Sequence, residues 1–429
     1  MSSPPHADPP PAKGTRRAEI LEAAANLFAA SGVRTSLKDI AEACGILPGS
    51  MYYHFESKEA LIIELVRHYR ADLDHIARQA WESLRATDPK PVQDRVIEFG
   101  REIASCANRH PAALLMSLFE PPPGASEELQ CLVQHTLTAI HDAMHAVLLS
   151  DPGGGALRSG IDLAMLADRL CESMIRHAVT VADYQLGPEA HHLSDLRCRI
   201  LLYGLAVEAP DKAALDRSDA LRSVTKAVAH WRPCEGDNER TTQLLTVARA
   251  EFARRGYEVA TLREIAAASG LNAGSVYRLF PSKSAMLDSI MGNFESQRKA
   301  AWDAIMDSSS TPLEKLDALT WLHIKLNERF GEEIRIQFGF VRESPLNTRR
   351  IAEPSQLRKI EKLLAEGIEL GEIRPHQVPL SMYARCIYEA LWTPETVLRK
   401  AGTEQAHALA RDTVLSGALA RLSGVLARP

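Results

Sequence analysis

The sequence predicts an all-α protein built from two similar halves that are fused head to tail. Three observations lead to this fold class. One segment near the N-terminus recurs about 225 residues later, apolar residues recur at helical spacing along most of the chain, and glycine or proline separates the helical stretches. A period this long indicates whole domains rather than a solenoid, and 429 residues are enough for two to four domains of ~100–200 residues.

The composition narrows the class of protein. Hydrophobic residues make up 45% and charged residues 24% of the chain, which excludes a wholly disordered protein. No stretch reaches the ~18 uncharged apolar residues that a membrane-spanning helix needs. A formal net charge of −5 excludes a uniformly basic nucleic-acid coat, although not a local basic surface. The seven scattered cysteines form no CxxC pair and the N-terminus has no apolar signal region, so we expect reduced thiols in a cytoplasmic protein.

The repeated segment is alike along its whole length. The first copy reads EILEAAANLFAASGVRTSLKDIAEACGILPGSMYYHFESKEALI and the second reads QLLTVARAEFARRGYEVATLREIAAASGLNAGSVYRLFPSKSAML. The two copies align throughout once a one-residue insertion is allowed in the second copy. The matched pairs are Phe28 and Phe252, Gly32 and Gly256, Ile40 and Ile265, Gly45 and Gly270, Gly49 and Gly274, Ser50 and Ser275, Tyr52 and Tyr277, Phe55 and Phe280, and Lys58 and Lys283.

Each copy predicts three short helices. The first helix carries apolar residues at helical spacing and ends at a glycine suited to a left-handed cap, Gly32 in the first copy. The second helix opens with a capping box, Ser36 with Asp39 in the first copy and Thr261 with Glu264 in the second.

A glycine-bearing turn then leads to the third helix. Gly45 and Gly270 follow the second helix, where a tight turn needs positive φ. Pro48 suits the first turn of the third helix in the first copy, and Asn272 suits its N-cap in the second. Two short helices joined by such a turn are typical of a helix-turn-helix.

Long helical stretches follow each copy. We expect helices over residues 57–87, 91–109, 126–150, 163–184 and 193–207 in the first half, and over 284–306, 312–330, 347–370, 380–399 and 403–426 in the second. Residues 334–340 alternate with strand period, but an isolated strand would have no partner, so we expect helix there too. Residues 212–231 predict an extra connecting helix before the linker 232–240.

These signals predict six segments. They are a disordered N-terminal arm over 1–14, a first helix-turn-helix domain over 15–61, a first helical bundle over 62–209, a connecting helix and linker over 210–237, a second helix-turn-helix domain over 238–287 and a second helical bundle over 288–429.

The two repeated motifs resemble a known family. SLKDIAEACGILPGSMYYHFESKEALI and TLREIAAASGLNAGSVYRLFPSKSAML both resemble the DNA-binding domain of TetR-family transcriptional regulators, with glycines, capping box, Tyr, Phe and Lys in the family's order. The resemblance implies two fused TetR-like units of nine or so helices. The first three helices of each unit would read DNA, and the remainder would form a bundle that binds a small effector and dimerises. The whole chain resembles a tandem TetR regulator.

The resemblance also implies which residues contact an operator of double-stranded DNA. Cap hydroxyls and first-turn cations would meet phosphate, the third helix would meet bases, and Tyr and Lys would clamp phosphate. The implied set is Ser36, Lys38, Leu47, Gly49, Ser50, Tyr52, Tyr53, His54, Lys58, Thr261, Arg263, Asn272, Gly274, Ser275, Tyr277, Arg278 and Lys283. Tyr52 and Tyr277 could also be core residues, and Lys58 and Lys283 could be merely solvated lysines at a helix start.

The halves differ where bases would be read. Asn272 and Arg278 have geometries suited to adenine and guanine edges, whereas Leu47 offers only apolar contact and is a poor helix cap. We therefore expect a single-chain pseudo-dimer on an asymmetric operator, acting as a ligand-responsive repressor. We call each helix-turn-helix domain a head. The alternative is that the first head is vestigial, and that a homodimer of chains binds a palindrome through the second head of each chain. A third alternative, an all-α enzyme or storage protein, lacks any visible catalytic or cofactor motif.

The second bundle holds more aromatic residues than the first. If one effector pocket exists, we expect it there, lined by aromatic residues and suited to a hydrophobic small molecule. The candidate lining residues are Trp321, Phe338, Phe340, Tyr383, Tyr388 and Trp392. The spacing of His135, His141 and His145 permits a metal site, but no further ligand completes it, so we expect no metal, no cofactor and no enzymatic activity.

Overall fold

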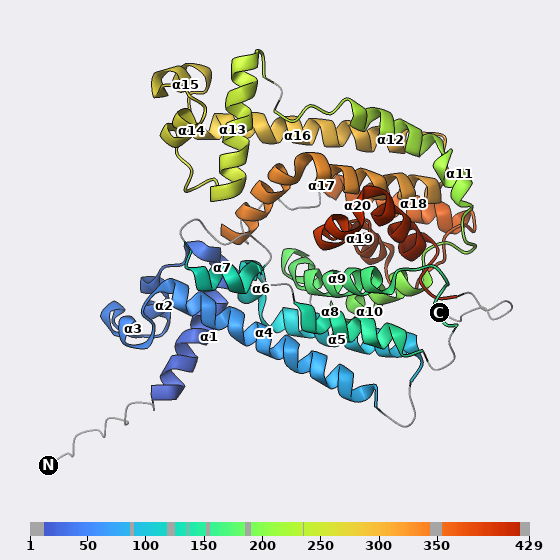
Figure 1. Ribbon diagram of the computed structural model, residues 1–429, viewed down its shortest axis with the longest axis horizontal. Helices are drawn as coiled ribbons and strands as arrows, with labels where there is room; N and C mark the ends of the chain where they lie inside the picture. The colour runs from blue at the N-terminus through green and yellow to red at the C-terminus, as the bar shows by residue number, and fades with distance from the viewer. Residues whose placement is uncertain are drawn as a thin grey trace. The chain divides into compact units, whose positions relative to one another are not determined.

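The computed structural model describes residues 13–85, 90–117, 125–134, 137–151, 155–184, 190–234, 236–343 and 354–420 (Figure 1). Across these ranges the chain is helical and forms only two isolated β-bridges, which confirms the all-α fold class. No helix among the described residues is long and apolar enough to cross a membrane. The predicted disordered arm lies mostly outside the described residues.

The chain forms two compact units. Unit 1 comprises Met1–Arg70, His110–His135 and Phe340–Thr348, and unit 2 comprises Ala71–Arg109, Thr136–Gly339 and Arg349–Pro429. The domain limits expected from the sequence remain a prediction beside this division.

Unit 1 contains the first helix-turn-helix. Its helices are α1 (Lys13–Ser31), the 3₁₀ turn η1 (Gly32–Arg34), α2 (Leu37–Ala43), α3 (Pro48–His54), the first half of α4 (Lys58–Ser83), α6 (Pro111–Ser117) and α7 (Glu127–Gln134). Apolar side chains from α1 to α4 are buried together in this unit: Ile20, Phe28, Ile40, Met51, Phe55 and Leu61. This core holds α2 and α3 at the angle of a helix-turn-helix, and α6 packs against α1.

Unit 2 contains the rest of the first half and most of the second. From the first half come the remainder of α4, α5 (Val92–Arg109), α8 (Thr138–Leu149), α9 (Leu163–Tyr184) and α10 (Ala190–Tyr203), followed by the connecting helices α11 (Lys212–Asp216) and α12 (Asp219–Ala229). From the second half come α13 (Glu239–Arg255), α14 (Leu262–Ala268), α15 (Ala273–Leu279), α16 (Lys283–Met306), α17 (Pro312–Glu343), α18 (Pro354–Glu369), α19 (Leu380–Ala390), α20 (Glu395–Ala410) and the π-helical η3 (Arg411–Leu415).

Several helix limits differ from those expected. The connecting helix is two helices, because Asp211 caps α11 and Ser218 caps α12. The expected break at residues 400–402 is confirmed, because the backbone of Gly402 within α20 is not helical (φ +73°, ψ 173°). The expected helix over residues 380–399 is itself divided, since α19 ends at Ala390 and α20 begins at Glu395 with Pro394 as its N-cap. Residues 334–340 belong to α17, as expected, although α17 kinks at Phe330.

The two halves of the chain meet inside unit 2 through reciprocal backbone hydrogen bonds. The segment after α10 donates to η3, and the segment after η3 donates in the same way to α10. The pairs are Leu205 N to Val414 O (2.9 Å), Ala206 N to Leu415 O (2.9 Å), Ala418 N to Leu201 O (3.1 Å) and Leu419 N to Leu202 O (2.8 Å). Such a reciprocal pattern is the mark of a two-fold relation, here between two parts of one chain.

A second pair of backbone hydrogen bonds follows the same two-fold relation. Arg158 N donates to Ala418 O and Arg374 N donates to Leu205 O, both at 2.9 Å. These arginines are the equivalent residues of the GALR and GEIR segments that the two halves share.

Buried charged side chains also join the halves within unit 2. Arg169 on α9 donates to the backbone carbonyl of Ala390 and to Thr393 Oγ1, and burial lowers the pKa of Arg169 to about 10. Arg197 on α10 lies 2.6 Å from Glu389 on α19. Because a buried charge is costly without a partner, these pairs specify the register in which the halves pack.

Candidate nucleic-acid interface

The second helix of the first head begins at the expected capping box. Ser36 Oγ accepts a hydrogen bond from Asp39 N at 3.1 Å, and Asp39 Oδ2 accepts one from Ser36 N at 2.7 Å. The backbone hydrogen bond from Ser36 is the main reason why the pKa of Asp39 is lowered. Lys38 is exposed in the first turn of α2 and lies 3.7 Å from Glu42 on the same helix.

Helix α3 presents large side chains to solvent. Leu47, Tyr52 and Tyr53 are 76%, 61% and 69% exposed, while Met51 beneath them is fully buried. Gly49 and Ser50 are exposed as well, and the ring of His54 packs edge-on against that of Tyr53. Leu47 provides no side-chain cap, as expected, and Pro48 stands at the start of the helix. Three large exposed residues on one short helix and its N-cap are unusual unless that surface contacts another molecule.

An unpredicted arginine holds α3 in place. Arg17 on α1 donates to the backbone carbonyl of His54 and to Glu64, and its guanidinium lies 4.1 Å above the Phe55 ring. It thereby satisfies a carbonyl at the end of α3. Lys58 is half-buried with its ammonium 5.9 Å from the Phe28 ring, and burial lowers the pKa of Lys58.

The second head, which lies in unit 2, repeats this construction with more arginine. Thr261 and Glu264 form the expected capping box. Hydrogen bonds from Thr261 and then from Arg255, 2.7 Å away, lower the pKa of Glu264 to about 2. Arg263 is exposed in the first turn of α14, where Lys38 stands in the first head.

Helix α15 has the polar cap that α3 lacks. Asn272 Oδ1 accepts a hydrogen bond from Ser275 N at 2.8 Å. Arg278 is exposed and donates to Ser275 Oγ at 3.1 Å, and Tyr277 is 56% exposed. Gly274 is exposed, but Ser275 is only 5% exposed, so it supports Arg278 from within the head.

Lys283 is engaged within the protein. Its ammonium donates to the backbone carbonyls of Tyr257 (2.7 Å), Glu258 (3.2 Å) and Ala260 (3.0 Å), and it lies 4.4 Å from the Tyr257 ring. A lysine has three N–H donors. Three carbonyl partners therefore favour a positioning role for Lys283 over direct phosphate binding.

The candidate effector residues come from two helices and from the turn that follows the second of them. Trp321 and Phe338 lie on α17, Tyr383 and Tyr388 on α19 and Trp392 just after α19, all in unit 2, whereas Phe340 belongs to unit 1. Trp321, Tyr383 and Tyr388 are buried. A cavity of about 380 Å³ in unit 2 is lined by other residues, Arg158, Ser159, Ala209, Ser416 and Ala420.

A histidine that the sequence did not single out lies among these aromatics. The ring of His323 lies 4.6 Å from that of Trp392, 5.6 Å from that of Tyr388 and 6.0 Å from that of Trp302. Complete burial lowers the pKa of His323 to about 3. The side chain is therefore neutral at physiological pH.

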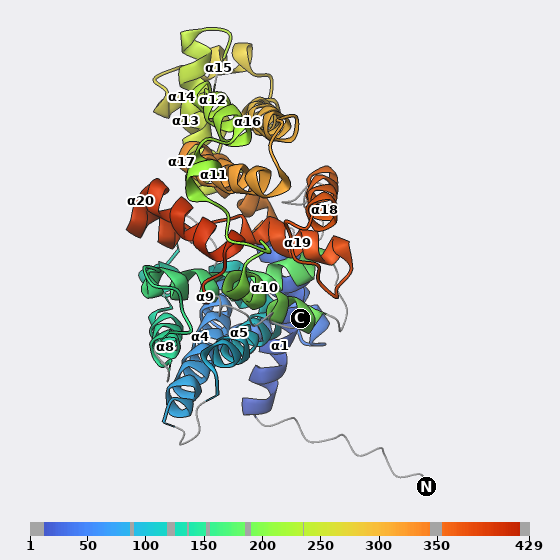
Figure 2. The same cartoon turned by 90° about the vertical axis from the view of Figure 1, so that its right-hand side faces the viewer.

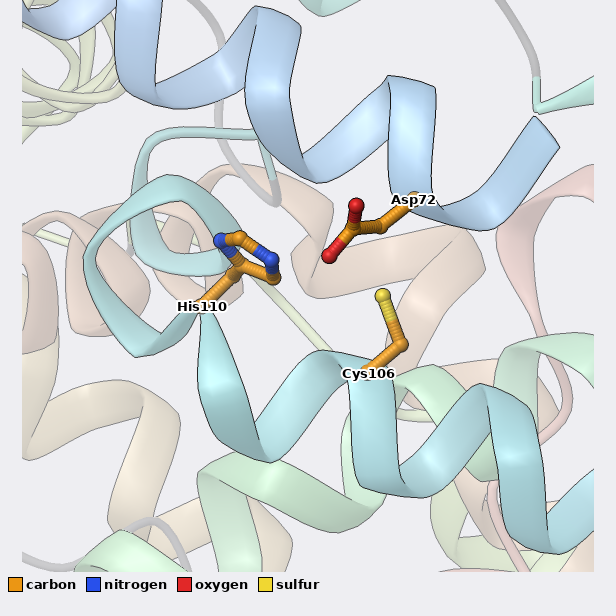
Figure 3. A group of neighbouring side chains, drawn as sticks. All are labelled: Asp72, Cys106 and His110. Atoms are coloured by element: carbon orange, nitrogen blue, oxygen red, sulfur yellow. The ribbon is translucent and has the colours of Figure 1, made fainter. Parts of the chain in front are cut away.

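Two side chains of metal-ligating type lie near each other in the described part of unit 2. Figure 3 shows Asp72 on α4 facing Cys106 on α5; His110, labelled there too, belongs to unit 1. Burial raises the pKa of Cys106 to about 12, which keeps it a thiol. His141 is bound to Asp168 at 2.5 Å, and His135 lies outside the described residues.

Known proteins resemble the chain first in the two heads. The model of the tetR family of bacterial regulatory proteins matches residues 20–65 and 244–290. The HTH-type transcriptional repressor KstR2 of Rhodococcus jostii is 50% identical over 72 residues, which are 17% of this chain and 35% of that protein. KstR2 of Mycobacterium tuberculosis is 29% identical over 176 residues, 38% of this chain and 84% of that protein.

One solved structure spans more than a head. The structure of the ketosteroid transcriptional regulator KstR2 of Mycobacterium tuberculosis covers 44% of this chain and 100% of its own, with 25% identity and a TM-score of 0.36.

Two helix-turn-helix heads on one all-α chain define a tandem protein of the helix-turn-helix class. The chain carries two copies of the domain that characterises the tetR family of bacterial regulatory proteins, at residues 20–65 and 244–290.

Proposed function

We propose that the protein is a sequence-specific DNA-binding transcriptional regulator that acts as a ligand-responsive repressor. The observation that carries this proposal is the pair of complete TetR heads, each with a capping box and an exposed third helix. The names of the relatives, transcriptional repressors of helix-turn-helix type, support it. We assign the chain no enzymatic activity and place it in the cytoplasm.

A single-chain pseudo-dimer is the form that we propose to bind DNA. The reciprocal hydrogen bonds around Leu205 and Ala418 support it, since each half uses the same segment to contact the other. The buried Arg169 and Arg197, both partnered across the halves, support it further. One chain then carries both readers, which suits half-sites that lie about 34–36 Å apart on one face of B-DNA.

The operator is asymmetric in this proposal. Helix α3 offers Leu47, Tyr53 and His54, whereas α15 offers Asn272 and Arg278. An arginine that pairs with guanine contributes about 1–3 kcal/mol of discrimination, while apolar contacts with a thymine methyl are less selective. The second head is therefore the more stringent reader.

A hydrophobic small molecule is the proposed effector. The aromatic side chains of α17 and α19 support this class of ligand, with His323 among them as a neutral hydrogen-bonding group. Effector binding would alter the spacing of the heads, and a coupling of ~1–3 kcal/mol would change operator affinity some five- to 150-fold.

Two observations favour a second candidate, in which the first head is vestigial. The α3 N-cap has no side-chain hydrogen bond, and Lys38 lies beside Glu42. Two chains would then bind a palindrome through their second heads, so the stoichiometry on DNA separates the candidates.

In vitro selection from random duplexes, followed by native mass spectrometry of the recovered complex, tests the proposal. We expect an asymmetric motif with unlike half-sites and one chain per duplex. A palindrome with two chains per duplex would support the vestigial head instead. No enrichment of any sequence, with folded protein, would refute the regulator function.

A further inference from the structure

We propose that the second head is fixed to its bundle by two ties that the first head lacks, which makes it the fixed reader of the pair. The ties are a linker brace, defined as residues 218–234, and Arg249 on α13. All of these residues lie in unit 2. In this arrangement Asn293 and Gln297 on α16 are positioning residues for the DNA-binding head that α16 carries.

The brace begins at the end of α16 that is remote from the head. Helix α12 lies along α16 in both views (Figures 1 and 2). Ser309 N donates to Asp219 Oδ2 at 3.2 Å, and Ala220 N donates to Ser310 Oγ at 2.9 Å. These bonds fix the start of α12 just beyond the end of α16.

The brace ends in a backbone clasp near the middle of α16. Arg232 N donates to Gln297 Oε1 at 2.7 Å, and its carbonyl accepts from Gln297 Nε2 at 3.0 Å and from Asn293 Nδ2 at 2.9 Å. Two side-chain amides thus satisfy both backbone groups of one linker residue, as a neighbouring strand would. The brace is therefore held at its start by the residues just after α16 and at its end by α16 itself.

Aromatic side chains also pack at the end of the brace that contains Trp231. Trp231, which is 4% exposed, meets the ring of Phe330 on α17 at 5.1 Å, and Phe330 meets Phe294 on α16 at 5.2 Å. Phe330 is the residue at which α17 departs from helical geometry. The linker, α16 and α17 therefore share one aromatic cluster.

Arg249 ties the first helix of the head to α17. Its Nε lies 2.6 Å from Glu333 and its Nη1 3.0 Å from Glu332, and Nη2 donates to the carbonyl of Arg329 at 3.1 Å. Glu333 is fully buried, so this pair is removed from solvent screening. Tilting α13 would separate a buried carboxylate from its partner.

Helix α11, which directly precedes the brace, is anchored at the junction of the two halves. Asp216 on α11 lies 2.6 Å from Arg411, and Lys212 lies 3.1 Å from Asp412. Arg411 in turn binds the buried Asp317 on α17. Through α11, the brace therefore connects α16 to the segment that pairs with the first half.

The first half lacks all three tying side chains. In the register set by Phe28 with Phe252 and Lys58 with Lys283, the position of Arg249 is occupied by Ala25. His68 and Asp72 occupy those of Asn293 and Gln297. This pair cannot reproduce the amide clasp, because an ionised aspartate accepts but does not donate hydrogen bonds.

The structural part of this inference stands without DNA, whereas its role in reading an operator rests on the proposed function. A fixed second head would hold the protein on its half-site while effector binding repositions the first head. Because conformational change needs an element with two arrangements, the unbraced head is where we expect the response.

Hydrogen exchange on the full chain tests the ties without DNA. The double variant Asn293→Ala/Gln297→Met removes the clasp, and Ser296→Ala, at an exposed position on the same helix, is the matched control. We expect about tenfold faster exchange in α12 and the middle of α16 for the double variant, with the control and the helices of unit 1 unchanged. Unchanged exchange in α12 and α16 would overturn the proposal.

DNA-binding measurements then show whether Asn293 and Gln297 position the second head or contact DNA themselves. The probes are the duplex recovered by selection and a duplex that keeps only the second half-site. We expect the double variant to lose at least about fivefold in affinity for the full duplex and less than about twofold for the half-site duplex. Equal losses on both would overturn the positioning role, and selection without any enriched duplex would refute the proposed function while leaving the exchange result standing.

Two variants at Arg249 distinguish the loss of a local tie from the unfolding of unit 2. Arg249→Ala places the first-half residue at this position, and Arg249→Ala/Glu333→Gln also removes the buried charge that the single change would strand. We expect both to raise exchange in α13 while α9 and α10 stay protected. Loss of protection throughout unit 2 in the charge-compensated variant would contradict a local tie.

Discussion

Gly204 and Gly417 face each other across the junction of the two halves, at equivalent positions. A Cβ atom on Gly204 would lie 2.4 Å from the backbone nitrogen of Gly417, and one on Gly417 would lie 2.6 Å from that of Gly204. Both residues have positive φ, +70° and +84°. The two chain segments therefore meet as backbone against backbone, which leaves room for the reciprocal hydrogen bonds on either side.

Gly204→Ala should destabilise unit 2 strongly. The substitution adds a clash with backbone to an unfavourable φ, and we expect a loss of about 2–4 kcal/mol in the free energy of unfolding. Gly371→Ala is the control, because Gly371 also has positive φ (+72°) but a Cβ there would meet nothing within 4 Å. Urea unfolding of both variants measures the difference. Equal losses would show that φ alone matters and that the two backbones at Gly204 and Gly417 are not in close contact.

In the two heads, the features that were predicted correctly are those set by residues close together in sequence. Both capping boxes, the Asn272 cap and the missing cap at Leu47 were expected and are confirmed. Each joins residues at most three positions apart, so residue type and spacing are enough to predict it. The fold class follows for the same reason, since helical period is also local.

Contacts between distant segments could not be predicted in this way. The sequence predicts Lys283 to be a phosphate clamp or a solvated lysine, but its carbonyl partners lie 23 to 26 positions earlier in the chain. The pairing of Arg249 with Glu333 and the burial of His323 likewise depend on how helices pack. Nothing in the sequence around these three polar residues indicates that they are buried, because their burial results from tertiary packing.

His323 should make stability depend on pH. Its pKa is about 3 in the folded protein because of burial, against an ordinary value near 6.5. Above pH 6.5 His323 is neutral in both the folded and the unfolded protein and does not affect the free energy of unfolding. Below pH 6.5 only the unfolded protein takes up the proton. The free energy of unfolding therefore falls as the pH falls, by up to ~1.4 kcal/mol per pH unit. Urea unfolding from pH 7.5 to 4.5 should show this slope, which His323→Gln should reduce and the exposed-site control His75→Gln should not. Parallel pH profiles for wild type and His323→Gln would contradict the assignment.

Lys283→Met should affect the stability of the second head more than its contact with phosphate. Losing three carbonyl partners should lower the free energy of unfolding by about 1–3 kcal/mol, because charged hydrogen bonds are lost and carbonyls are left without a donor. The slope of log affinity against log salt should stay within ~0.5 of wild type, whereas Arg263→Met, at an exposed position, should reduce it by about 0.9. A salt slope reduced equally by both changes would assign Lys283 to the phosphate contacts after all.

Arg278 and Tyr53 occupy equivalent exposed positions on the two third helices, so their alanine variants report on the two heads separately. Arg278→Ala should cost about 1–3 kcal/mol of discrimination at one base pair of one half-site, because a bidentate contact with guanine is lost. Tyr53→Ala should weaken the other half-site through lost apolar contact, with a smaller change in sequence preference. Selection with each variant resolves the two half-sites, and Ser275→Ala adds a graded case, since it frees Arg278 from its 3.1 Å partner without removing the guanidinium. If Tyr53→Ala leaves the selected motif and its affinity unchanged while Arg278→Ala weakens both halves of a palindrome, only the second head reads DNA and two chains share each site.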